Sequence, residues 1–108
     1  MGRLEVIDED IELKHYEVKL SESALEALRE ISSKADYLKV RRRMQMLRVA
    51  PSMGAIYRPI YESAMPDHEV RATYAGHFGI YFTIDEEASE VTVEYVEDSR
   101  RDPLKKFS

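Results

Sequence analysis

The chain has 108 residues and a formal net charge of −5, which allows one domain with a core and argues against indiscriminate binding to polyanions. It contains no cysteine, so disulfides and thiolate metal ligands are excluded. No apolar run approaches the ~20 residues of a membrane span, and the acidic start does not resemble a secretory signal. These features predict a cytoplasmic protein that makes no membrane contact.

The N-terminal part divides into an acidic stretch and a first strand. Residues 1–12 are rich in Asp and Glu, and we expect an arm that precedes a single domain over residues 13–108. Over residues 13–20, Tyr16, Val18 and Leu20 alternate with polar side chains. This period of two predicts a strand with one buried face.

Two helical patterns follow the first strand. The first is predicted over residues 22–33, where Ser21 can act as a cap and residues 23–26 fit a capping box. The second is predicted from a cap at Asp36 to Ala50, because Pro51 disfavours helical geometry at the residue before it. The apolar stripe of this helix consists of Tyr37, Val40, Met44 and Leu47. The short link predicts an antiparallel helical hairpin.

The second half of the chain has the periodicity of a sheet. We predict antiparallel strands over residues 68–74, 77–85 and 90–96, with a tight turn at Gly76. Residues 55–61 contain Pro59 and can form at most an edge strand. The predicted buried positions are Phe78, Ile80, Phe82, Ile84, Val91, Val93 and Tyr95. The fold class is therefore α+β, with an N-terminal strand and a helical hairpin packed on a mostly antiparallel sheet in two layers.

Several of these segments together resemble the RelE/ParE superfamily of toxin–antitoxin toxins. The segments are the first strand that ends at Leu20, the helix end at residues 48–54, the stretch from Gly76 to Glu86, and residues 99–104. The resemblance spans about Tyr16 to Leu104. It implies a small cytoplasmic protein that an antitoxin holds inactive, as a homodimer or as a toxin–antitoxin hetero-oligomer.

The resemblance to the RelE branch implies ribosome-dependent cleavage of mRNA. Arg71 and Arg100 match basic positions of that branch, and His77 could exchange protons beside them. Metal-free RNA cleavage needs a base, an acid and cations that stabilise the phosphorane, so the catalytic prediction is Arg71, His77 and Arg100. We expect Arg101 to contact RNA and Tyr81 to stack on a base. No cofactor is expected, and the histidines lack the spacing of metal ligands.

Other functions of the same superfamily stay open. The frequent arginine of the RelE branch falls at Gly79, and its aromatic residue falls near Leu104. RNA cleavage is the first prediction, and these differences keep two alternatives open: a ParE-like inhibitor of DNA gyrase that catalyses nothing, or a family member that is not toxic and acts by protein–protein contact. In each alternative we expect the basic second helix to bind an acidic antitoxin segment through Arg41, Arg42 and Arg43.

Overall fold

A computed structural model describes residues 15–57 and 69–100 of the chain. Three predictions lie outside these residues and stay predictions. They are the arm over residues 1–12, the contact of Arg101 with RNA, and the match of Leu104 to the aromatic position of the RelE branch. The elements in chain order are β1 (Glu17–Leu20), α1 (Glu22–Arg29), α2 (Lys34–Met46), the short 3₁₀ helix η1 (Pro51–Met53), β2 (Ala55–Ile56), β3 (Arg71–Ala75), β4 (Phe78–Asp85) and β5 (Glu90–Asp98).

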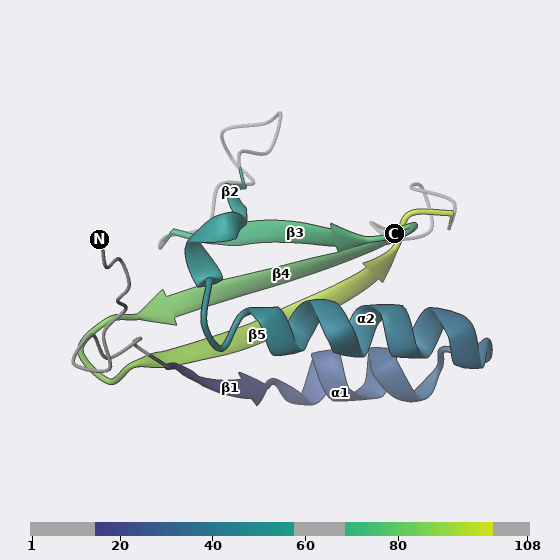
Figure 1. The fold of residues 1–108 in the computed structure, drawn as a ribbon. Coiled ribbons are helices and arrows are strands. Elements are labelled where there is room, and N and C mark those ends of the chain that lie inside the picture. Colours follow the sequence, from purple (N-terminus) through teal and green to yellow (C-terminus); the bar gives the residue numbers. More distant parts are fainter. Residues whose placement is uncertain (1–14, 58–68, 101–108) are drawn as a thin grey trace, which may run out of the picture.

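The described strands form one sheet in the order β1-β5-β4-β3-β2, and α1 and α2 lie side by side on one of its faces (Figure 1). β1 runs parallel to β5, and all other neighbours are antiparallel. The predicted two-layer α+β class is therefore confirmed. β1 and β2 are the edge strands, and β2 therefore has the edge position that was expected for a strand in residues 55–61. No helix in the described part of the chain is long and apolar enough to cross a membrane.

Serines cap both helices, and this moves the predicted helix starts. The Ser21 hydroxyl accepts a hydrogen bond from the Ala24 amide at 3.0 Å, as predicted, whereas the capping box expected to begin at Ser23 lies inside α1. Ser33, not Asp36, caps α2 by accepting from the Asp36 amide at 3.2 Å. Ser33 has the extended geometry that this role requires, so it cannot belong to α1, which ends at Arg29 rather than at residue 33 as predicted.

The second helix ends earlier than predicted. Its last residue is Met46, and Ala50, directly before Pro51, has φ −141° and ψ 59°, outside helical geometry. The predicted apolar stripe is correct: Val40, Met44 and Leu47 are buried, and Tyr37 packs partly against them. With Ala24 and Leu28 of α1, these side chains cover the inner face of the sheet. That face contributes Phe78, Ile80, Phe82, Val91, Val93 and Val96.

A β-bulge in β5 corrects one predicted core position. Phe82 pairs with Val93 but Tyr81 pairs with Tyr95, so Glu94 is an extra residue on β5. The bulge reverses the alternation beyond it: Tyr95 is 41% exposed, and Val96 is buried in the place expected for Tyr95. The carbonyl of Glu94 accepts a hydrogen bond from the Ser21 hydroxyl at 2.7 Å. One serine thus joins the start of α1 to the bulge.

The β3–β4 connection agrees with the sequence. Gly76 has φ +61°, the conformation for which a glycine was predicted there. This turn brings His77 to the end of the sheet where β5 finishes, because the Ser99 amide and hydroxyl both donate to the His77 carbonyl, at 2.8 and 2.7 Å.

Candidate functional site

The turn between β3 and β4 places His77 between two carboxylates. Its Nε2 lies 3.5 Å from Asp36 Oδ2, in the first turn of α2, and 3.9 Å from Asp98 Oδ1, at the end of β5. The ring also stacks on Phe78, with 4.4 Å between the centroids. Nε2 is buried and makes no hydrogen bond within the described part of the chain. The two carboxylates make this position attractive to cations rather than to phosphate.

Arg100 belongs to the same cluster. Its Nε and Nη2 donate to Asp98 Oδ1 and Oδ2 at 3.2 and 3.1 Å, and its amide donates to Oδ1 at 2.9 Å. The hydrogen bonds from Arg100 lower the pKa of Asp98, and the same contact raises the pKa of Arg100. Both side chains therefore stay charged at neutral pH, and the arginine's fork is already occupied by a carboxylate.

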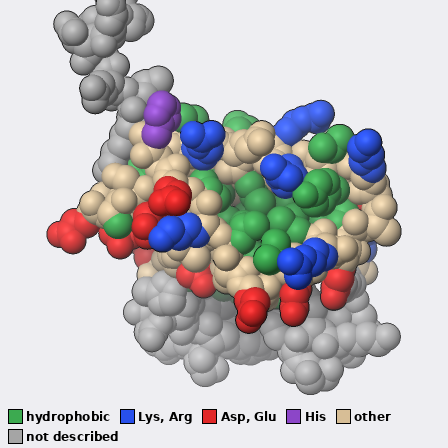
Figure 2. Space-filling view, turned by 90° about the horizontal axis from the view of Figure 1, so that it is seen from below, with side chains coloured by type: hydrophobic (Ala, Val, Ile, Leu, Met, Phe, Trp, Pro, Cys, Tyr) green, Lys and Arg blue, Asp and Glu red, His purple; other side chains and the backbone are tan. Residues whose placement is uncertain are grey.

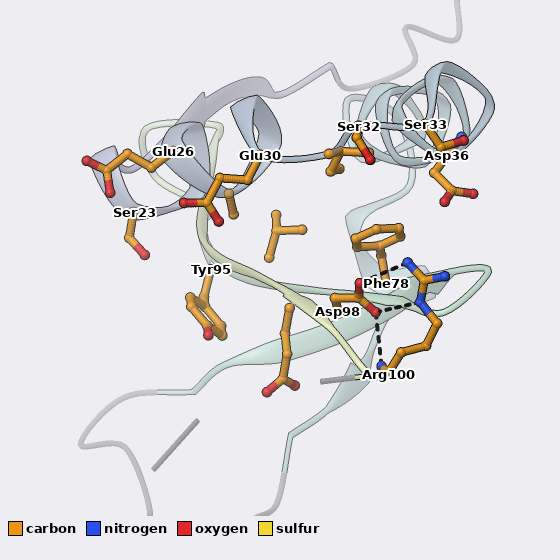
Figure 3. Close-up of a pocket in the computed structure, with 14 residues that line it drawn as sticks. Ser23, Glu26, Glu30, Ser32, Ser33, Asp36, Phe78, Tyr95, Asp98 and Arg100 are labelled. Atoms are coloured by element: carbon orange, nitrogen blue, oxygen red, sulfur yellow. Dashed lines mark hydrogen bonds and ion pairs between the residues drawn. The ribbon is translucent and has the colours of Figure 1, made fainter. Parts of the chain in front are cut away.

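An acidic hollow of about 380 Å³ opens beside this cluster. Figure 3 shows Arg100 turned toward Asp98, with Asp36 near them, and Glu26 and Glu30 on the α1 side. Among the described residues that line the hollow, Arg100 is the one cation, and the carboxylates are Glu26, Glu30, Asp36, Glu97 and Asp98. Such a balance of charge repels a phosphate group.

Arg71 does not join His77 and Arg100. It lies at the start of β3, and the four-residue step to Ala75 spans about 14 Å at the usual strand rise. Its Nη1 donates to the Gly54 carbonyl at 2.8 Å, and its Nη2 contacts Glu69 at 3.2 Å. The structure thus brings two members of the predicted catalytic trio together and leaves the third at the far end of the strand.

Tyr81 lies on the opposite face of the sheet from Arg71. Arg71 pairs with Phe82, and directly opposite residues share a face, so Arg71 points to the helix side and Tyr81 to the outer side. The Tyr81 hydroxyl donates to Glu97 at 3.1 Å, and burial together with Glu97 raises its pKa. Sequence reasoning missed the neighbouring tyrosines, 57, 74 and 95, that lie on this face with it.

An apolar groove of about 300 Å³ lies between β1, α1 and α2. Figure 2 shows hydrophobic side chains gathered into one patch on this side, with Lys and Arg side chains along its edge. The apolar lining is Val18, Leu20, Leu25, Leu28 and Met44, and the polar part includes Tyr37, Arg41, Gln45 and Arg48. The Arg41 guanidinium is held there, donating to the Tyr37 hydroxyl at 3.0 Å. We call this feature the arginine-edged groove.

The predicted antitoxin-binding arginines divide between faces of α2. Arg41 lines the arginine-edged groove, whereas Arg42 and Arg43 do not. Arg48, seven residues beyond Arg41 and just past the end of α2, lines it instead, although it was not among the arginines predicted to bind the antitoxin. The spacing of 41, 45 and 48 on one helix face is the signal that would have identified it.

The described residues contain no cluster of His, Asp or Glu suited to a metal ion. The carboxylates of Asp36 and Asp98 around His77 attract cations, the arginine-edged groove provides an apolar and cationic surface, and the outer sheet face provides aromatic rings. Binding is thus the chemistry that most of these groups support.

No family model and no curated protein sequence matches the chain. The fold, however, is that of the RelE toxins. RelE–RelB of Pyrococcus horikoshii is similar with a TM-score of 0.61 and 14% identity, over 82% of this chain and 99% of that one. The RelBE2 toxin–antitoxin complex of Mycobacterium tuberculosis has a TM-score of 0.66 and 20% identity, over 82% and 97%. Free Escherichia coli RelE with two arginines replaced has a TM-score of 0.58 and 15% identity, over 85% and 92%.

Proposed function

We propose that this protein is the toxin of a toxin–antitoxin pair. The RelE-like fold, which spans nearly the whole length of toxins solved with their antitoxins, is the observation that carries the proposal. Expression of the chain alone should arrest bacterial growth, and co-expression with the product of an adjacent antitoxin gene should restore it. Normal growth at confirmed soluble expression would reject toxicity and leave the third alternative, a non-toxic family member that binds proteins.

The arginine-edged groove is the proposed antitoxin site. Its apolar floor suits the apolar face of an amphipathic segment, and Arg41 and Arg48 at its edge suit acidic side chains on that segment. Among the described strands β1 lies at the edge of the sheet beside the groove, so its outer edge offers backbone hydrogen-bonding groups as well. An acidic antitoxin segment that folds on binding fits both features.

This placement can be tested with charge reversals on two faces of α2. Arg41→Glu with Arg48→Glu should weaken antitoxin binding by calorimetry at least about tenfold, because truncated or reversed charge pairs at interfaces cost several-fold in affinity. Arg42→Glu with Arg43→Glu makes the same change in charge outside the groove and should bind almost as the wild type does. Equal losses in both double variants would reject the groove as the site.

Inhibition by binding a protein target, as in the gyrase-inhibiting branch, is the mode of action that the geometry supports best. Arg71 is remote from His77 and Arg100, and Arg100 is already paired with Asp98. The acidic hollow beside them disfavours RNA phosphate. Purified protein should therefore inhibit supercoiling by gyrase in vitro, and Arg100→Gln should leave that inhibition and growth arrest intact. Normal supercoiling at a large excess of the protein would reject gyrase as the target.

Ribosome-dependent RNA cleavage remains the second candidate, because Asp98 holds both His77 and Arg100 near one point. In this mechanism Asp98 would release Arg100 to the phosphate, and His77 would transfer a proton. Cleavage of mRNA on translating ribosomes, abolished by His77→Ala or Arg100→Ala, would establish it. Growth arrest without any cleavage would end it.

A further inference from the structure

The outer face of the sheet carries an unusual concentration of tyrosines. Four of the six tyrosines in the described part of the chain lie there, one from each neighbouring strand or its end, and we call them the tyrosine face: Tyr57, Tyr74, Tyr81 and Tyr95. Tyr81 is central, with ring centroids 5.3 Å from Tyr57 and 6.2 Å from Tyr95. Both described helices lie on the other face, and in Figure 3 Tyr95 points away from them.

The sheet is built to hold these rings. Gly79 pairs with Tyr74, and a Cβ on it would lie only 3.2 Å from the rings of Tyr74 and Tyr81 and from the Tyr81 hydroxyl. A larger residue there would push the rings apart. The bulge at Glu94 turns the Tyr95 side chain to the outer face of the sheet, since without the bulge that side chain would point to the core. The Tyr81 hydroxyl is fixed by its bond to Glu97.

The rings remain accessible within the described part of the chain. Tyr74 is 56% exposed, and Tyr57 and Tyr95 are exposed by 37% and 41%. Solvated aromatic rings gathered on one face are typical of interfaces, where tyrosine combines a large contact area with a low loss of side-chain entropy.

The charges around the tyrosine face are mostly negative. Among the described residues, Glu90, Glu94 and Glu97 share this side of β5 with the rings, because Glu90 and Glu97 pair with Asp85 and Gly79 of β4 and Glu94 accepts from Thr83. Lys19 of β1 is the described cation on the same side, and it is bound to Glu90 at 2.8 Å. RNA, whose affinity depends on neutralised phosphates, is therefore disfavoured here.

We propose that the tyrosine face binds a segment of a partner protein that presents arginine or lysine side chains. Such cations can lie over the tyrosine rings while their charge is balanced by the neighbouring glutamates. The inference adds a binding surface to the proposed toxin and does not depend on toxicity or on the arginine-edged groove.

Titration with a nona-arginine peptide tests this proposal. The full chain is labelled with 3-fluorotyrosine, and binding is followed by ¹⁹F NMR at moderate salt. The resonances of the tyrosine face should shift on titration. Those of Tyr16 and Tyr37, which pack on the helix side, should not, and they serve as internal controls. A single-stranded oligouridylate should leave the tyrosine face unchanged.

Matched variants separate specific binding from attraction to an acidic protein. Tyr74→Ser with Tyr95→Ser, and separately Glu94→Gln, should each weaken the peptide affinity about fivefold. Glu87→Gln, an equal change in charge in the turn between β4 and β5 and outside the acidic hollow, should have little effect. The proposal is overturned if all variants bind the peptide as the wild type does, or if oligouridylate binds and the tyrosine replacements weaken that binding instead.

Discussion

Gly54 shows how closely a single residue can be constrained by a distant one. A Cβ built on it would lie 2.7 Å from the ring tip of Phe82, which is fully buried, and 3.0 Å from the Ala72 carbonyl. Gly54→Ala must therefore displace the core ring or the edge strand, and we expect a loss of about 1–3 kcal/mol in the free energy of unfolding. Urea denaturation measures it. The neighbouring exposed Ser52→Ala is the control, and equal stability of both variants would contradict the contact.

The pKa of Asp98 makes a second prediction for a single residue. Because the Arg100 hydrogen bonds lower this pKa, the pair stabilises the fold above the ordinary aspartate range and stops doing so as the pH falls through the lowered value. Arg100→Gln should raise the pKa of Asp98 toward about 3.9, measured by carboxyl NMR titration. Arg41→Gln, far from Asp98, should not. An ordinary aspartate titration in the wild type would refute the pairing.

Arg71 illustrates what a residue's sequence position does not tell. Its strand was predicted correctly, but its face depends on pairing with Phe82, and its partner is a carbonyl at Gly54, seventeen positions away. The predicted roles of Arg71, His77 and Arg100 in catalysis, and of Tyr81 in RNA binding, stay predictions.

At the scale of elements, Ser21 is the junction between α1 and β5. Its hydroxyl accepts from the Ala24 amide and donates to the Glu94 carbonyl, so Ser21→Ala removes a helix cap and leaves the bulge carbonyl without this donor. We expect a loss of about 1–2 kcal/mol by thermal or urea unfolding. Ser23→Ala, on the exposed first turn, should change stability by less than about 0.5 kcal/mol. If Ser23→Ala lost more stability than Ser21→Ala, the capping box predicted at Ser23 would be correct instead.

Local patterns in the sequence predicted which helices and strands exist. They did not predict where the helices end, or that Tyr95 of β5 points to the outer face of the sheet. The alternation in 77–85 and the stripe from Val40 to Leu47 are strictly periodic, so they identified a strand and a helix. Ser21 and Ser23 both lie near the start of α1, and composition alone made either a suitable cap. The structure selects Ser21, which has the extended backbone that a cap needs. The bulge at Glu94 is stabilised by Ser21, which no local pattern in β5 reveals.

At the scale of the whole molecule, the tyrosine face should make stability fall at alkaline pH. Burial, with Glu97, raises the pKa of Tyr81, so the folded protein holds that proton when the unfolded chain begins to lose it. Above the ordinary tyrosine pKa of about 10, the free energy of unfolding therefore decreases. Tyr81→Phe should reduce this decrease, measured by urea unfolding at about pH 8 and pH 10.5. Tyr37→Phe, on the helix side and not among the groups that raise the Tyr81 pKa, is the control, and parallel behaviour of both variants would refute the effect.

By itself the sequence determined the α+β class, the helical hairpin, the buried stripe of α2 and the turn at Gly76, because each depends on periodicity or on the backbone freedom of a few adjacent residues. It also carried the resemblance that led to the toxin fold. Only the tertiary structure decided which side chains meet: Arg71 apart from His77, Arg48 beside Arg41 in the groove, and the tyrosines assembled over Gly79. Those encounters depend on strand register and on a bulge, which contacts between distant segments select together.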